Sequence, residues 1–274
     1  MAVASLELSG RTVLVTGAAR GIGLAAATAL AARGARLALL DVDATELERQ
    51  AHALGAAHAA VDVTDGDAVR AAVGELRGRV GPIDVVLANA GVEPPAATVL
   101  TVDPAAFERV LAVHVHGTWH TVRATLPDVA QRGGHVLVVG SLYSFMAGPL
   151  AAPYAMAKAA IEQLGRALRT ELRPHGATAG VAYFGFVQTA LVDRTFAQPA
   201  FATLREVLPD WYTRPIPVQR AADAIVRGVE RRSARVVAPR WLTPLMAARG
   251  LLPALDERLA RDERVQAVIR ATER

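Results

Sequence analysis

The sequence has no cysteine, a single lysine and few aromatic residues, and these shortages narrow what the protein can do. Without cysteine, the chain can form no disulfide bond and can use no catalytic thiol, and a reducing compartment suits it. No uncharged apolar run reaches the roughly 20 residues of a membrane span. The N-terminal residues lack the basic start and apolar core of a signal peptide. We therefore expect a soluble, cytoplasmic protein.

The charged residues are poorly arranged for binding nucleic acid. Basic residues exceed acidic ones by only 30 to 26, and they are interspersed along the chain. A nucleic-acid surface usually clusters its basic residues and interleaves them with aromatic ones. We predict no nucleic-acid partner. The 52% hydrophobic content of the 274 residues instead favours one large domain with an extensive buried core.

Short apolar runs alternate with helix-like segments along most of the chain. Strands are expected at 12–16, 36–41, 57–61, 83–88, 135–139, 178–184 and 234–238, with helices at 22–33, 45–54, 65–79, 104–131, 154–173 and 220–231. Apolar runs without alternation indicate strands that are covered on both faces, and intervening helices indicate parallel pairing. The fold class is therefore predicted as α/β, a single doubly wound parallel sheet of about seven strands with helices on both faces.

The alternation stops after Gly185. We predict that residues 1–240 form one dinucleotide-binding and catalytic domain, in which residues 189–217 are an irregular lid over a substrate, because long loops in compact domains are usually functional. Residues 241–274 are expected to be a C-terminal extension that packs on the domain or on a partner subunit. Binding of its apolar part, Trp241 to Leu252, to a membrane is the least favoured alternative.

A glycine-rich turn joins the first predicted strand to the first predicted helix. Its glycines allow a tight turn and close approach of a ligand, and the helix N-terminus offers free N–H groups to a pyrophosphate. The spacing is Gly-x-x-x-Gly-x-Gly, which differs from the Gly-x-Gly-x-x-Gly dinucleotide fingerprint. The predicted cofactor-binding residues of this turn are Gly17, Arg20, Gly21, Ile22 and Gly23.

Asp41 closes the second predicted strand, 18 residues after Gly23. A carboxylate at this place can accept hydrogen bonds from the adenosine ribose, and it repels a 2′-phosphate. Arg20 favours the opposite choice, since a basic residue in the turn can reach a 2′-phosphate. We give Asp41 more weight and predict NAD as the cofactor, with NADP less favoured.

The single lysine, Lys158, follows Tyr154 by four residues. In a helix, these positions share a face, so the ammonium can stand beside the phenol. A nearby positive charge favours phenolate and lowers a tyrosine pKa from its usual value of about 10. Tyr154 is therefore a candidate general acid and base. The alternative is a surface lysine beside a tyrosine that only packs.

Together these elements resemble the short-chain dehydrogenase/reductase family, over residues 6–240. The motifs that carry the resemblance are the 16–23 turn, Asp62-Val63, Asn89-Ala90-Gly91, Ser141 placed 13 residues before Tyr154, and the Tyr154/Lys158 pair. The resemblance implies a Rossmann-like fold and an NAD(P)-dependent oxidoreductase that assembles as a homodimer or homotetramer.

The resemblance also implies roles for the matching positions. Tyr154 would exchange a proton with the substrate oxygen, Lys158 would lower its pKa and bind the nicotinamide ribose, and Ser141 would hydrogen-bond the substrate oxygen. The implied contacts along the cofactor are Asp62 and Val63 at the adenine, Asn89, Ala90 and Gly91 as support, and Val187 and Thr189 at the carboxamide and phosphates.

Two positions depart from the family pattern. His114 stands where the family usually has an asparagine that helps hold a water in a proton relay. Histidine can also donate and accept a hydrogen bond and titrates near neutrality, so we predict a catalytic role for it; filling space in the helix is the alternative. Phe184 stands where proline is common. His114, His116 and His120 invite a metal interpretation, but no carboxylate completes a set, so we predict no metal site.

The residues expected at the reacting end are mostly apolar and bulky: Glu93, Leu142, Tyr143, Phe145, Phe184, Phe186 and Trp211. Such pockets gain affinity from buried apolar area. We predict hydride transfer between NAD(H) and a hydrophobic secondary alcohol or ketone. The alternatives are an NADPH-dependent carbonyl reductase and a catalytically weak nucleotide-binding regulatory protein.

Overall fold

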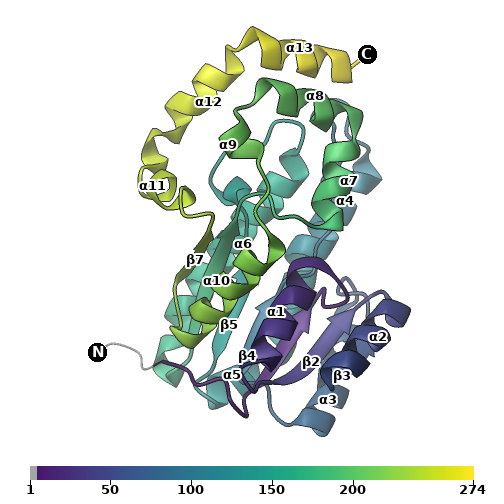
Figure 1. The fold of residues 1–274 in the computed structure, drawn as a ribbon, viewed down its shortest axis with the longest axis vertical. Coiled ribbons are helices and arrows are strands. Elements are labelled where there is room, and N and C mark those ends of the chain that lie inside the picture. Colours follow the sequence, from purple (N-terminus) through teal and green to yellow (C-terminus); the bar gives the residue numbers. More distant parts are fainter. Residues whose placement is uncertain (1–4) are drawn as a thin grey trace.

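The computed structural model describes residues 5–274 and contains one seven-stranded sheet in which every pair of neighbours is parallel (Figure 1). The strand order is β3-β2-β1-β4-β5-β6-β7, which is the doubly wound arrangement and confirms the predicted fold class. The bounds are β1 Thr12–Thr16, β2 Arg36–Asp41, β3 Ala57–Ala60, β4 Val85–Ala88, β5 His135–Val139, β6 Thr178–Phe184 and β7 Arg235–Ala238.

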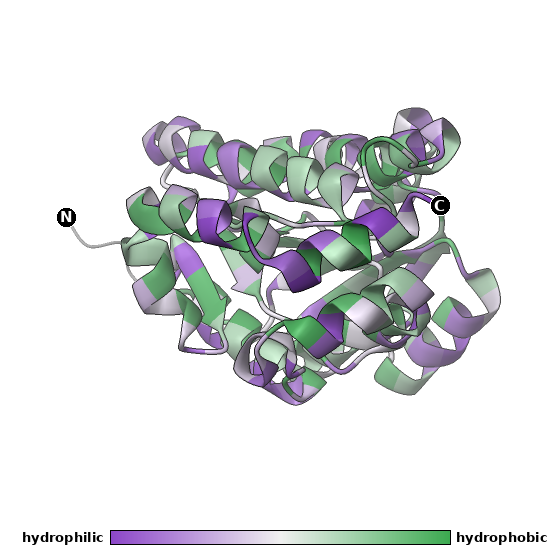
Figure 2. Ribbon diagram, turned by 90° about the horizontal axis from the view of Figure 1, so that it is seen from above, coloured by the Kyte–Doolittle hydropathy of each residue, from purple (hydrophilic) through white to green (hydrophobic). Residues whose placement is uncertain are grey.

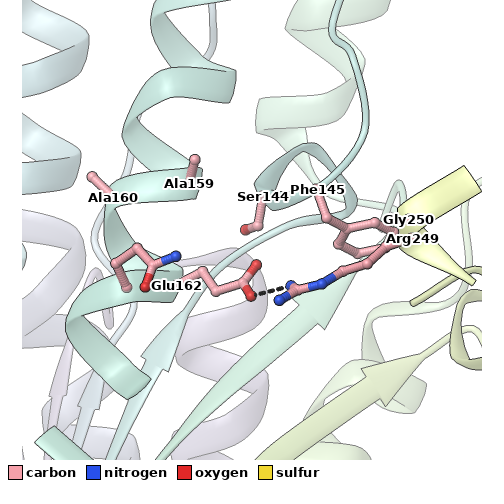
Figure 3. Close-up of a pocket in the computed structure, with 8 residues that line it drawn as sticks. Ser144, Phe145, Ala159, Ala160, Glu162, Arg249 and Gly250 are labelled. Carbon is pink, nitrogen blue, oxygen red and sulfur yellow. Dashed lines mark hydrogen bonds and ion pairs between the residues drawn. The ribbon is translucent and has the colours of Figure 1, made fainter. Parts of the chain in front are cut away.

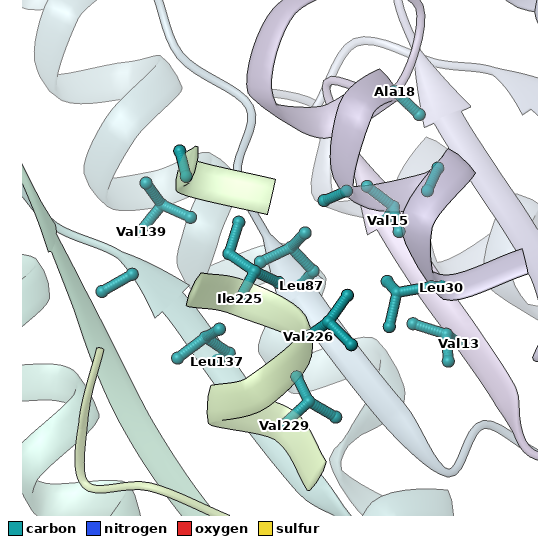
Figure 4. Packing of buried hydrophobic residues seen from close by; sticks show 14 of the residues in the cluster. Val13, Val15, Ala18, Leu30, Leu87, Leu137, Val139, Ile225, Val226 and Val229 are labelled. Atoms are coloured by element: carbon teal, nitrogen blue, oxygen red, sulfur yellow. The ribbon is translucent and has the colours of Figure 1, made fainter. Parts of the chain in front are cut away.

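Helices cover both faces of the sheet because the central strands are apolar on both sides. One face carries α1 (Gly21–Ala31), α2 (Ala44–Leu54) and α10 (Val218–Glu230). The other carries α3 (Gly66–Val80), α5 (Gly117–Gln131) and α6 (Ala152–Glu171). Figure 4 shows Leu137 beside Ile225 and Val229 of α10, and Val13 beside Leu30 of α1. Seen from above, the outer helices alternate hydrophilic and hydrophobic turns, as a layer that is packed on one side should (Figure 2).

The predicted helix at 104–131 is interrupted. α4 (Pro104–Leu111) passes into a π-helical segment, η1 (Ala112–His116), before α5 begins. A π-helical turn inserts an extra residue into the helix and is frequent at functional sites. His114 lies within it.

The predicted irregular region 189–217 is mostly helical. It contains α7 (Ala190–Ala197), α8 (Pro199–Val207) and α9 (Asp210–Thr213). The C-terminal residues form α11 (Leu242–Ala247), α12 (Leu252–Ala260) and α13 (Glu263–Thr272), which arch over α8 and α9 (Figure 1). We call α7–α9 and α11–α13 together the cap. The remaining elements are the short 3₁₀ turns η2 (Leu142–Ser144), η3 (Arg173–His175) and η4 (Arg249–Leu251).

Val265 and Val268 of α13 pack against Phe201 and Leu204 of α8, so the extension covers its own chain. Within residues 5–274, no helix has the length and apolar character needed to cross a membrane.

Candidate active site

A cleft of about 880 Å³ opens where the strands end, between the β1–α1 turn, the segments after β2 to β6, the α4–α5 region and α7. In doubly wound sheets, ligands bind at the carboxyl ends of the strands, at the point where the strand order reverses. Here that point lies between β1 and β4. All the predicted cofactor residues line this cleft except Gly23: Gly17, Arg20, Gly21, Ile22, Asp41, Asp62, Val63, Asn89, Ala90, Gly91, Tyr154, Lys158, Val187 and Thr189.

The glycine turn has a backbone that other residues could not adopt. Gly17 and Gly21 have φ angles of +66° and +59°, in the left-handed region. A Cβ on Gly23 would lie 2.0 Å from the Gly17 carbonyl oxygen, so Gly23 is needed for packing inside the turn. The side-chain amide of Asn89 fixes this geometry by donating to the Thr16 carbonyl oxygen at 3.0 Å.

The N-terminus of α1 has no side-chain cap, so the N–H groups of its first turn are not satisfied by a side chain. These N–H groups and the helix dipole face a cleft that is large enough for a dinucleotide. The residues present therefore fit a pyrophosphate, and a cofactor of the NAD(P) class, without any adjustment of the turn.

Asp41 is positioned by two backbone hydrogen bonds. Its carboxylate oxygens accept from the N–H of Ala19 at 2.9 Å and from the N–H of Asp43 at 3.0 Å. Each oxygen keeps a lone pair for a further donor. Arg20 forms an ion pair with Asp43, so its charge is partly neutralised beside Asp41. Both features weigh against a 2′-phosphate.

Three side chains meet at the base of the cleft. Lys158 is buried on α6, and its Nζ donates to the Val139 carbonyl oxygen at 2.8 Å and lies 5.4 Å from the centre of the Tyr154 ring. Ser141 Oγ accepts from the N–H of Tyr143 at 3.2 Å, and its hydroxyl also forms a hydrogen bond with the Tyr154 hydroxyl. Ser141, Tyr154 and Lys158 thus lie together at the cleft wall.

The pKa of Tyr154 differs from the prediction. Burial raises it to about 12, and a hydrogen bond with Ser141 opposes that rise only in part. Burial also lowers the pKa of Lys158 to about 7. The expectation that Lys158 would depress the pKa of Tyr154 is wrong for this structure, because loss of hydration dominates for both groups and the ammonium is directed at a carbonyl. Tyr154 is a neutral phenol here.

His114 is buried, with 2% of its surface exposed, and its Nε2 is 2.9 Å from the Val92 carbonyl oxygen and 3.2 Å from the Val92 nitrogen. Its ring meets the Tyr154 ring edge-on, with centroids 5.1 Å apart. Burial, followed by the charge of Lys158, lowers the pKa of His114 to about 3. The prediction that His114 titrates near neutrality is therefore wrong. Nδ1 of this neutral imidazole is buried without a hydrogen-bond partner.

Of the seven predicted substrate residues, only Glu93 and Phe184 line the cleft. Four of the others belong to a largely aromatic cluster that packs against Tyr154: Leu142, Tyr143, Phe186 and Trp211. In this cluster, Tyr143 lies edge-on to Tyr154 and Phe186, at centroid distances of 6.1 and 6.4 Å. Trp211 is 56% exposed and lies edge-on to Trp241. Aromatic pairs favour such edge-on arrangements.

Phe145 lies on the far side of α6, at a second, open hollow of about 600 Å³. Figure 3 shows this hollow with the ion pair between Glu162 of α6 and Arg249 of the extension, in which Oε1 and Nη1 are 2.6 Å apart. Glu162 is buried and follows Lys158 by one helical turn. The hollow is therefore a seam between the helix of Tyr154 and the C-terminal extension.

The sequence analysis missed several residues of the cleft, above all Arg109 and Arg194, which lie on α4 and α7. Arg194 forms an ion pair with Glu93 at 3.0 Å. The sequence held one indication for Arg109. It precedes Val113 by four residues, so in a helix the two share a face, and Val113 is the neighbour of the predicted site residue His114. His120 Nδ1 donates to the Val63 carbonyl oxygen at 3.0 Å. Residues 5–274 contain no group of three metal-ligating side chains.

Comparison with known proteins gives consistent matches. Residues 11–200 match the family described as short chain dehydrogenase. The chain is 35% identical to galactitol 2-dehydrogenase (L-tagatose-forming) of Cereibacter sphaeroides, over 74% of this chain and 82% of the relative. It is 36% identical to 1-deoxy-11-beta-hydroxypentalenate dehydrogenase of Streptomyces exfoliatus, over 68% and 71%. A short chain dehydrogenase from Mycobacterium paratuberculosis bound to NAD superposes with a TM-score of 0.71 at 28% identity, over 85% and 97%.

Proposed function

Because this chain belongs to the short-chain dehydrogenase family of oxidoreductases, we propose that it transfers a hydride between NAD(H) and a hydrophobic secondary alcohol or ketone. The observation that carries the proposal is the meeting of Ser141, Tyr154 and Lys158 in one cleft with the glycine turn. When bound, the nicotinamide cofactor supplies or accepts the hydride, and the protein supplies orientation and proton transfer.

In ketone reduction, Tyr154 acts as the proton donor. Tyr154 lines the cleft beside Ser141, and a substrate oxygen placed there accepts from both hydroxyls in exchange for the hydrogen bond between them. Two donors at one oxygen orient the carbonyl and stabilise the negative charge that develops there. Lys158 holds the end of β5 through Val139, and its Nζ lies over the Tyr154 ring. In alcohol oxidation, the same groups act in reverse.

His114 is a positioning residue in this proposal. Its Nε2 holds the backbone of Val92 at the cleft wall, and its unpartnered Nδ1 lies among Tyr154 and Lys158 as a site for a water molecule. A neutral imidazole whose Nε2–H donates to the Val92 carbonyl leaves Nδ1 as an acceptor.

NAD is the preferred cofactor in this proposal, and NADP is the alternative. The carboxylate of Asp41 at the end of β2 repels a 2′-phosphate, and the ion pair with Asp43 diverts Arg20 from one. Titration with NADH and NADPH tests this preference directly. Asp41→Ala is expected to weaken NADH binding and to narrow the ratio between the two affinities by about tenfold. An Asp41→Ala variant with the wild-type ratio would remove Asp41 from cofactor selection.

The substrate is proposed from the apolar lining of the cleft, which includes Val92, Phe184, Leu191 and Val192. The names of the relatives span a polyol and a pentalenate derivative, so a substrate panel must include galactitol as well as bulky apolar alcohols. We expect the rate of NADH formation to favour the apolar alcohols. A strong preference for polyols would contradict this assignment while leaving the reaction type intact.

The alternative of a catalytically weak regulatory protein has less support, because Ser141, Tyr154 and Lys158 are all present and together. We also propose a homodimer or homotetramer, located in the cytoplasm. Trp119 of α5 and Met156 of α6 are about half exposed, at 49% and 53%, and apolar surface of this kind suits assembly. Light scattering on the purified protein measures the assembly size.

A further inference from the structure

Two side chains of the cap reach across to the loop that follows β4. Arg194 of α7 binds Glu93 with two hydrogen bonds, from Nε at 3.0 Å and from Nη2 at 3.2 Å. Gln198, between α7 and α8, donates to the Pro94 carbonyl oxygen at 3.0 Å and accepts from the N–H of Ala96 at 2.8 Å. These contacts join segments about 100 residues apart in sequence.

The ion pair borders the proposed cofactor site. Glu93, from the loop after β4, and Arg194, from α7, both line the cleft, together with Val92 and Leu191. The glycine turn, Tyr154 and Lys158 line the same cleft. A dinucleotide that lies between the turn and Tyr154 is therefore enclosed by a bridge from α7 to the 92–97 loop.

The helices α7 and α8 are held by different forces on their two sides. Toward the cleft, their contacts are polar and partly solvated, with 51% of the Arg194 side chain and 34% of the Glu93 side chain exposed. Away from the cleft, Phe201 and Leu204 are fully buried against Val265 and Val268. Polar contacts at the surface exchange readily for water, whereas separation of the apolar contact exposes carbon to solvent. The polar side is the one that can open.

We propose that Arg194, Glu93 and Gln198 form a clasp that gates exchange of the dinucleotide. The clasp must break before the cofactor can leave, and α7–α8 moves away from the 92–97 loop while α8 and α13 stay together. Lid opening and product release often limit turnover in enzymes, so the clasp sets the rate of cofactor exchange. The proposal rests on the proposed function for the identity of the ligand. In it, Glu93 binds the lid and is not the substrate ligand predicted from the sequence.

The test is the rate at which NADH dissociates, followed by its fluorescence in stopped-flow displacement with excess NAD. Arg194→Ala, Glu93→Gln and Gln198→Ala are each expected to release NADH about two- to fivefold faster than the wild type, since partly exposed polar contacts contribute modestly. The control is Arg70→Ala, which removes an exposed ion pair with Asp67 on α3 and should change nothing. Unchanged dissociation in all three clasp variants would overturn the proposal.

Charge reversal makes the test more specific. Glu93→Arg and Arg194→Glu should each speed dissociation, and the double variant should return it toward the wild-type rate, because the pair is rebuilt with its charges exchanged. High salt should narrow the difference between wild type and Arg194→Ala, while the Gln198→Ala difference should persist. A double variant as fast as the single variants would show that the ion pair does not act as a unit, against the proposal.

Hydrogen exchange on the cofactor-free protein separates this proposal from the proposed function. The clasp variants should exchange faster at residues 93–97 and 190–207, and Arg70→Ala should not. Failure of both NADH and NADPH to bind would refute the proposed function and, with it, the gating role. Normal binding with unaltered exchange and release in the clasp variants would refute the clasp alone.

Discussion

The sheet and the cap of this protein are stabilised in contrasting ways. Every residue of β1, β4, β5 and β6 is buried, and the strands are joined by regular parallel hydrogen bonds between two helical layers. The cap consists of helices of four to ten residues, which are held by a few side chains. Isolated helices of this length are marginal, so they depend on packing.

The difference has a functional counterpart. The proposed cofactor side of the cleft is made by backbone geometry at strand ends, which leaves little freedom for substitution. The cap borders the same cleft through Arg194, whose contact with Glu93 other side chains could replace. The two regions can therefore change independently, because they are separately stabilised.

The largest expected effect is at Tyr154, where the two regions meet: it lines the cleft and also packs against clusters that include the cap. Tyr154→Phe keeps the ring and removes the acid. We expect turnover to fall by about 10²- to 10⁴-fold. NADH affinity, measured by fluorescence titration, should stay within about twofold, because the ring packing is retained. Wild-type turnover in Tyr154→Phe would remove this residue from the mechanism.

Large-to-small substitutions separate the two regions by their stability. Leu39→Ala on β2 removes a fully buried side chain from the sheet and should lower the free energy of unfolding by about 2–5 kcal/mol. Phe201→Ala removes a comparable side chain from α8, 2% exposed. We expect its main effect to be local, with faster hydrogen exchange at 199–207 and 263–272 and a smaller shift in the urea midpoint. Equal midpoint shifts would show that cap and sheet unfold as one unit.

The same contrast explains what could be predicted from the sequence. β1, β2, β5 and β6 have the predicted bounds, because a strand buried on both faces leaves an uninterrupted apolar run. The motif residues line the cleft because strand ends fix their places. Gly23 is the exception, and its fit against Gly17 shows that a glycine can be required by packing alone.

The helices of the cap were not predicted, although its two segments were expected as a lid and a C-terminal extension, and its residues show why. α9 has four residues and α7 eight, too few to display helical periodicity, and four prolines interrupt residues 199–217 before α10. The bulky residues Tyr143, Phe186 and Trp211 were assigned to the substrate, yet they pack with other aromatic side chains. The ion pair between Glu93 and Arg194 spans 101 positions, and nothing local in the sequence indicates it.

The pH dependence of the unfolding free energy should reveal the lowered pKa of His114. Its pKa is lowered to about 3 from a usual value of 6.5, so between these values the unfolded chain binds a proton that the folded chain excludes. Stability is therefore lost as pH falls through that window, by about 1.4 kcal/mol per pH unit in its middle. His114→Asn should reduce the slope of unfolding free energy against pH by that amount between about pH 4 and 6.

His135 provides the comparison within the sheet. Burial also lowers its pKa to about 3, and it remains in the His114→Asn variant, so that variant should keep part of the acid sensitivity. His135→Gln should remove a similar slope without affecting turnover, since His135 lies on β5 away from the cleft lining. An unaltered slope in His114→Asn would mean that the imidazole is hydrated in the folded state.

The smallest expected effect is at the seam between α6 and the extension. Arg249→Ala removes the 2.6 Å ion pair with Glu162, but Arg166 still faces that carboxylate at 3.8 Å, so the charge is not left alone. We expect a loss of about 1 kcal/mol or less in global stability, with faster exchange in residues 249–260. Arg261→Ala breaks an exposed pair with Glu257 in the same extension and should change neither. Equal effects of the two substitutions would mean that apolar packing alone holds the extension to α6. The seam would then be stabilised as the sheet is, by buried apolar contacts, and not as the cap is, by a few polar side chains.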